Sequence, residues 1–120
     1  MNIRQFFGIQ PKLPIETIQA YYNRLPDEIE VSWFRDEDFI VAEIKANGNE
    51  FMTQGKGAED LIDMVNDAVI SMEIPQKFVP LMKNTKAYIP PIEEIAKLKN
   101  LSIESALISL HKDKKVPQVV

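Results

Sequence analysis

The sequence predicts an α+β protein: a three-stranded antiparallel sheet with one packed helix, flanked by an N-terminal helix and a C-terminal helical pair. Three observations lead to this fold class. Apolar residues alternate with polar ones between residues 29 and 54, they recur at helical spacing from Ala58 to Met72, and helical spacing returns towards both ends. At 120 residues and 45% hydrophobic composition, the chain suits one compact core with small appendages.

The alternation that begins at Ile29 is typical of a strand with two different faces. Residues expected on one side are Ile29, Val31 and Trp33, and those on the other are Glu30, Ser32 and Phe34. The polar cluster 35–38 then predicts a hairpin turn, and the aromatic and β-branched run 39–44 predicts a second strand. Lys45 to Asn49, with Asn47-Gly48 inside it, reads as the next turn, so residues 50–54 would form strand three.

The segment from Ala58 to Met72 has the clearest helical period in the chain. The residues predicted on its packed face are Ala58, Leu61, Val65, Ala68, Val69 and Met72. Gly57 is an acceptable N-cap, Glu59 and Asp60 complement the positive end of the helix dipole, and Pro75 marks the exit.

The flanking segments carry shorter patterns. Ile15, Ile18, Tyr22 and Leu25 predict a packing helix over 14–25, whereas residues 1–13 show no clear period. Phe78-Val79 and Ala87 to Ile89 are each candidates for an edge strand. The spacing of Ile92, Ile95, Ala96 and Leu98 predicts one C-terminal helix, and Ser102 is the expected cap of a second, which would bear Ile103, Ala106, Leu107 and Leu110. The chain thus divides into residues 1–28 (arm and helix), 29–91 (sheet and helix) and 92–120 (helical segment and tail).

Several stretches of the central segment resemble the HicB family of antitoxins. Residues 39–44, Phe-Ile-Val-Ala-Glu-Ile, look like the second strand of that family, and Thr53-Gln54-Gly55 matches the end of its third strand. Glu59-Asp60, Ile62-Asp63 and Asp67 to Val69 follow its helix without a gap. The resemblance covers residues 29 to 72, about a third of the chain.

This resemblance implies a partly open sheet with a helix on one face, similar to a truncated ribonuclease H fold without its catalytic carboxylates. It also implies the function of a non-catalytic antitoxin, which binds and masks a small basic ribonuclease toxin and often represses its own operon through a C-terminal DNA-binding segment. On this basis we expect no enzyme activity, a small basic protein toxin as partner, and association into a homodimer.

Charge is distributed unevenly along the chain. Residues 1–80 hold 7 basic and 14 acidic side chains, a balance of about −7, while residues 81–120 hold 7 basic and 4 acidic ones, about +3. An acidic body attracts a basic partner, and a basic end can approach phosphates. No stretch approaches the roughly 20 apolar residues that span a bilayer and no signal peptide is evident, so the expected location is the cytoplasm.

The sequence offers little for catalysis or for a cofactor. It has no cysteine, and its single histidine, His111, is expected at a helix end where it faces the dipole. The aspartates 60, 63 and 67 and the acidic turn 36–38 fit a solvated surface better than a cation site. Gly55-Lys56-Gly57 lacks the spacing of a nucleotide-binding loop. We therefore predict no catalytic residue, no metal and no cofactor.

The candidate partner-binding residues lie on the first two predicted strands. They are Trp33, Phe34, Phe39, Val41 and Glu43, although strand aromatics more often fill a core.

Two alternatives to a toxin-binding role remain open. A transcriptional regulator would grip DNA through Lys112, Lys114 and Lys115, although the outward positions of the second helix (Glu104, Ser105, Ile108 and Ser109) carry no arginine or lysine. A scaffold or phage-type inhibitor would use the same fold for an unrelated partner.

Overall fold

A computed structural model describes residues 14–82 and 86–113. It contains three α-helices, one 3-10 helix and a four-stranded antiparallel sheet among those residues. The helices are α1 (Pro14–Arg24), α2 (Ala58–Glu73) and α3 (Ile92–Lys99), with the 3-10 helix η1 at Gln76–Met82. The strands are β1 (Glu28–Asp36), β2 (Phe39–Ala46), β3 (Asn49–Gly55) and β4 (Ser105–His111), in the order β3-β2-β1-β4. The predicted α+β class and the strand-strand-strand-helix order over residues 29–72 are confirmed.

The first three strands form a meander closed by two short turns. Glu37 and Asp38 connect β1 to β2, and Glu37 adopts φ 57°. Asn47 and Gly48 connect β2 to β3 with φ values of 51° and 77°, the positive values that a two-residue hairpin turn requires. Because the turn takes only these two residues, β2 and β3 run up to it directly and are longer than the predicted ranges 39–44 and 50–54.

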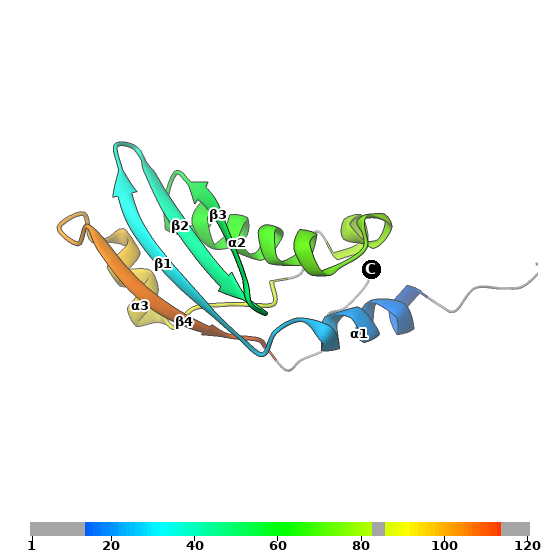
Figure 1. The fold of residues 1–120 in the computed structure, drawn as a ribbon. Coiled ribbons are helices and arrows are strands. Elements are labelled where there is room, and N and C mark those ends of the chain that lie inside the picture. The colour runs from blue at the N-terminus through cyan, green and yellow to red at the C-terminus, as the bar shows by residue number, and fades with distance from the viewer. Residues whose placement is uncertain (1–13, 83–85, 114–120) are drawn as a thin grey trace, which may run out of the picture.

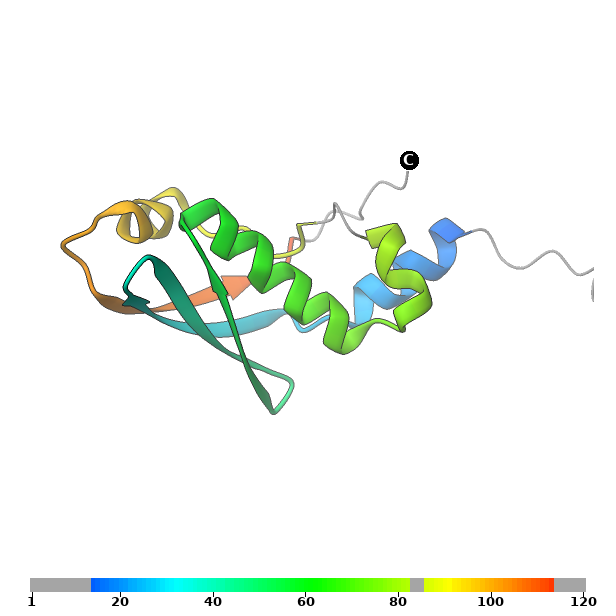
Figure 2. The same ribbon diagram turned by 90° about the horizontal axis from the view of Figure 1, so that it is seen from above.

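The helices cover one face of the sheet. Figures 1 and 2 show α2 and α3 on the same side of the strands, with α1 and η1 together beyond one end. Helix α2 packs on β2 and β3, and Tyr21 of α1 stacks near Phe78 of η1 with ring centroids 5.3 Å apart. The predicted N-terminal helix over 14–25 is confirmed, while Phe78-Val79 belongs to η1 and is not a strand.

The core lies between the sheet and the helices. Residues Ile29, Val31 and Trp33 of β1 are buried on this inner face, as the alternation predicted. Helix α2 buries more of its surface than predicted, because η1, α3 and the segment 86–90 also contact it. Ile62, Asn66 and Ile70 are therefore buried, whereas Met72 is 55% exposed and not part of the packed face.

The prediction of a second helix in the C-terminal pair is wrong. Helix α3 forms as expected, but residues 105–111 form strand β4 and pair antiparallel with β1 from Ser105 opposite Phe34 to His111 opposite Glu28. The apolar residues of this segment fit both a helical and an alternating period. The segment forms a strand and not a helix because β1 offers an edge that pairs along its full length. The strand also buries Ile108 in the core, whereas a helix would turn it outward. The sheet thus has four strands and not three.

Two basic side chains hold the ends of helices against the sheet. Arg35 donates from Nε to the carbonyl oxygen of Ile103 at 2.7 Å and from Nη2 to those of Leu98 at 2.6 Å and Asn100 at 2.8 Å. Cations are favourable there because the last carbonyls of a helix lack partners within it and carry partial negative charge. Arg35 therefore secures the C-terminal end of α3 to β1.

Lys112 does the same for α1, and we expect its replacement to destabilise the fold. Its ammonium donates to the carbonyl oxygens of Tyr22 at 3.1 Å and Leu25 at 2.9 Å, and its side chain is only 9% exposed. We predict that Lys112→Met lowers the free energy of unfolding by about 2 kcal/mol, since it removes charge-assisted hydrogen bonds at a helix terminus. Urea unfolding followed by circular dichroism measures this value.

Lys99→Met is the matched control. The Lys99 ammonium lies 2.8 Å from Glu59, but both side chains are more than half exposed. An exposed ion pair of this kind contributes little to stability, because solvent screens it. Equal destabilisation by the two variants would contradict the capping role of Lys112.

Candidate partner-binding surface

The side of the sheet that faces away from the helices forms a continuous surface, which we call the open face. The pairing register and the alternation of side chains define its members. They are Glu28, Glu30, Ser32, Phe34 and Asp36 of β1, Phe39, Val41, Glu43 and Lys45 of β2, Glu50, Met52 and Gln54 of β3, and Ser105, Leu107, Ser109 and His111 of β4. In the part of the chain that the structure describes, no helix packs on this face (Figure 2).

An apolar patch occupies one half of the open face. Phe34 is 37% exposed, and Met52 and Leu107 are each 61% exposed at opposite edges of the sheet. Val41 lies directly opposite Phe34 in the register and is nearly covered, although it does not belong to the core cluster. Solvent contact with several large apolar side chains of one face is a feature of surfaces that bind other molecules.

Acidic side chains share the open face with this patch. The open face carries five carboxylates, at Glu28, Glu30, Asp36, Glu43 and Glu50, and a single lysine, Lys45. Glu43 lies next to Met52 in the register, close to the apolar centre. The surface therefore combines exposed apolar side chains with negative charge, a combination that suits a basic partner with an apolar anchor.

The residues predicted to bind a partner separate into two groups. Phe34, Val41 and Glu43 lie together on the open face, and Phe39 is half-buried beside the first hairpin turn. Trp33 lies on the inner face, where it is 1% exposed and stacks beneath the Arg35 guanidinium at 5.2 Å. Trp33 is therefore a core residue and not part of the open face, in agreement with the alternative that strand aromatics fill the core.

Sequence reasoning missed two members of the apolar patch. Met52 alternates with the half-buried Phe51 in β3, so the strand period contained the signal needed to find it. Leu107 was assigned to a helix, and only the pairing of β4 with β1 places it opposite Ser32 on the open face.

The residues considered for DNA binding are only partly described. The Lys112 ammonium donates to the carbonyl oxygens at the C-terminal end of α1. Lys114 and Lys115 lie outside the described residues. The second helix that this alternative required is strand β4. His111 lies on that strand, not at a helix end, with its Nε2 3.6 Å from a carboxylate oxygen of Glu28.

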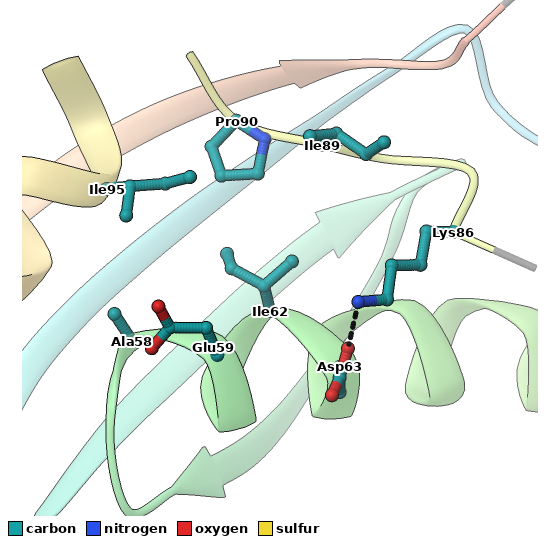
Figure 3. A pocket seen from close by; sticks show the side chains of 8 residues that line it. All are labelled: Ala58, Glu59, Ile62, Asp63, Lys86, Ile89, Pro90 and Ile95. Atoms are coloured by element: carbon teal, nitrogen blue, oxygen red, sulfur yellow. Dashed lines mark ion pairs between the residues drawn. The ribbon is translucent and has the colours of Figure 1, made fainter. Parts of the chain in front are cut away.

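A concave region lies on the helical side of the molecule. A cavity of about 240 Å³ opens between α2, the segment 86–90 and α3, as Figure 3 shows. It is lined by Ala58, Glu59, Ile62, Asp63, Lys86, Ile89, Pro90 and Ile95. Its charged groups already have partners: Asp63 lies 3.2 Å from Lys86, and Glu59 lies 2.8 Å from Lys99, which lowers the pKa of the Glu59 carboxyl. The cavity thus presents apolar walls.

The remaining perturbed groups are two tyrosines that stabilise the fold. Burial, and then the nearby Asp113, raises the pKa of Tyr22, whose hydroxyl donates to the backbone carbonyl of Asp113. Burial raises the pKa of Tyr88 strongly, and its hydroxyl donates to the carbonyl of Pro26. Both phenols therefore stay protonated at neutral pH and act as hydrogen-bond donors inside the molecule.

The described residues contain neither a metal-binding cluster nor a helix that could cross a membrane. Within residues 14–82 and 86–113, no group of three histidine, aspartate or glutamate side chains is arranged to hold a metal ion. None of the helices in those ranges is long and apolar enough to cross a membrane. No family model, curated protein or solved structure matches this chain.

Proposed function

We propose that this chain is a non-catalytic, antitoxin-like binding protein that masks a small basic protein through the open face of its sheet. The observation that carries the proposal is the composition of that face, where the exposed apolar side chains of Phe34, Met52 and Leu107, with Val41 beside Phe34, share the surface with five carboxylates and one lysine. A ribonuclease toxin that binds RNA presents the complementary positive surface. Masking requires contact alone, and the face supplies it without any catalytic group.

The apolar patch and the carboxylates act at different stages of such a complex. Opposite potentials speed the encounter of two proteins and fall off with added salt. Desolvated aromatic side chains near the middle of an interface then supply most of the binding energy. Phe34 is the one aromatic side chain exposed within the patch, on a central strand beside Val41, and we assign it the anchoring role.

Co-expression tests the assignment directly. The chain is produced together with each small basic protein encoded next to its gene, under conditions where that protein alone arrests growth. Rescue of growth and co-purification of the two chains are the expected results. No stable complex and no rescue would refute the toxin assignment, and a stable complex with a protein that has no ribonuclease activity would favour the inhibitor or scaffold alternative.

Substitution of Phe34 tests the surface itself. We expect Phe34→Ala to weaken the complex about 30-fold, equivalent to roughly 2 kcal/mol for an interface anchor. Met64→Ala is the matched control, because Met64 is exposed to the same 37% but lies on α2, away from the open face. Isothermal titration calorimetry measures both affinities, and equal losses would show that the open face is not the binding surface.

Charge reversal provides an independent arm of the same test. Glu43→Lys is expected to slow association at low salt, with the difference shrinking as salt is added. Asp67→Lys, an exposed reversal on α2, makes the same change in net charge without touching the open face. If the two variants associate at the same rate, net charge alone governs the encounter.

A further inference from the structure

The outer edge of β4 carries backbone groups that point away from the sheet. The backbone N–H of Arg35 donates to the carbonyl of Glu104 at 2.9 Å, and that of Lys112 donates to the carbonyl of Asp27 at 2.8 Å. Glu104 and Lys112 thus turn their backbone groups towards β1, and in an antiparallel pair every second residue does the same. Between them, the backbone N–H and C=O groups of the even-numbered residues point towards β1, and those of the odd-numbered residues point away from the sheet.

The outward-facing residues of the exposed edge are Ser105, Leu107 and Ser109. All three are exposed, and β4 is the last strand of the sheet on this side. Coverage of this edge begins only past the strand, where the backbone N–H of Asp113 donates to the carbonyl of Ala87 at 2.8 Å. The stretch from 105 to 109 therefore remains open for pairing within the described part of the chain.

The composition of β4 does nothing to protect this edge. Proteins usually guard an exposed edge strand with a charged residue, a proline or a bulge, because a bare edge pairs with other chains. Strand β4, with the sequence Ser-Ala-Leu-Ile-Ser-Leu-His, holds no lysine, carboxylate, proline or glycine. The edge strand at the other end of the sheet, β3, carries Glu50 and packs against α2. The two edges therefore differ in a way that marks β4 as the one built to pair.

We propose that β4 pairs antiparallel with β4 of a second copy of this chain, about a two-fold axis through Leu107. In this register Leu107 lies opposite its own counterpart, and Ser105 lies opposite Ser109 of the other copy. Each outward N–H and C=O of the three residues then gains a partner, and the two four-stranded sheets become one continuous sheet. This interface lies beyond the partner-binding role proposed above and does not depend on it.

A second copy suits this edge for electrostatic and steric reasons. An uncharged strand meets its own copy without the like-charge repulsion that opposes most self-pairing, and the contact is isologous and closes on itself. The nearest open-face carboxylates belong to β1, so both β4 strands separate those of the two copies by roughly 14 Å, beyond the screening length at physiological salt. Leu107, 61% exposed in the single chain, packs against its mate.

Cross-linking of single engineered cysteines tests the pairing. The chain has no native cysteine, so Leu107→Cys introduces the only thiol. Met52→Cys is the matched control, since Met52 is equally exposed at 61% on the same face but at the opposite edge. With a short bis-maleimide reagent we expect the Leu107→Cys protein to form covalent dimers and the Met52→Cys protein to form none, because its thiols lie at the far edges of the paired sheet. Equal cross-linking of the two would overturn the proposal.

Removal of a single backbone donor provides the second measurement. Ser109→Pro deletes an N–H that points outward, leaving the ladder to β1 intact. Light scattering after gel filtration measures the mass of the particle. We expect the unmodified protein and Ser109→Ala to be dimers, at twice the 13.7 kDa chain mass, and Ser109→Pro to be a monomer, at the mass of one chain. An unmodified protein that stays monomeric at high concentration, or a folded Ser109→Pro protein that stays dimeric, would overturn the pairing. If Ser109→Pro does not fold, the cysteine pair decides.

Discussion

Replacing Asn66 with leucine is expected to lower the free energy of unfolding by about 4 kcal/mol, a large share of the roughly 5–15 kcal/mol that holds a typical domain folded. Asn66 is the one buried polar side chain other than the aromatic ones within the described residues, and it is 2% exposed. Its Nδ2 donates to the carbonyl of Tyr88 at 2.9 Å, and its Oδ1 accepts from the backbone N–H of Tyr88 at 2.8 Å. The amide thus pairs with Tyr88 as a neighbouring strand would.

Leucine has a similar volume but neither a donor nor an acceptor. Both backbone groups of Tyr88 would remain in the core without partners, at a cost of about 1–3 kcal/mol each. Urea unfolding measures the total, and hydrogen exchange at the Tyr88 amide reports the same loss locally. Asp67→Leu, the adjacent exposed position of α2, controls for the change in helix composition and is expected to shift stability by less than about 0.5 kcal/mol. An Asn66→Leu protein as stable as this control would show that the two hydrogen bonds between Asn66 and the Tyr88 backbone contribute nothing to stability.

Gly55→Ser is the second substitution for which we expect a large loss, about 3 kcal/mol, because it overpacks a contact between backbones. A Cβ atom at Gly55 would lie 2.5 Å from the backbone nitrogen of Leu61 and 2.7 Å from its Cα. Backbone atoms of a helix cannot move aside as a flexible side chain can, so the first turn of α2 would have to shift away from β3. The absence of a side chain at residue 55 sets how closely α2 approaches the sheet.

Gly57→Ser makes the same chemical change two residues later. A Cβ at Gly57 meets no atom within 4 Å, and the residue is the N-cap of α2, a position that serine favours. We expect Gly57→Ser to be neutral or slightly stabilising in thermal and urea unfolding. Should both serine variants lose the same stability, the close approach at Gly55 is not the cause.

The local part of the fold was readable from the sequence because it depends on neighbouring residues. Strands β1 to β3 follow from alternation, their turns from Asn47-Gly48 and the acidic cluster, and α2 from its apolar period and Gly57. The alternation in β1 put Phe34 on the opposite face from Val31 and Trp33, as the structure shows. It did not decide between the core and the surface for Trp33, since both faces of β1 carry an aromatic residue.

The chain by itself determined the hairpins, the amphipathic helices and the acidic balance, since these depend on residue type, spacing and turn chemistry over a few positions. Only the tertiary structure decided three features. Residues 105–111 pair with β1, Asn66 forms hydrogen bonds with the Tyr88 backbone, and Lys112 donates to the carbonyls at the end of α1. Each of these joins residues 22 to 90 positions apart in the chain, and its free energy comes from burial and from backbone groups that need partners. A short apolar segment with two compatible periods adopts the one that the rest of the molecule can pair and cover.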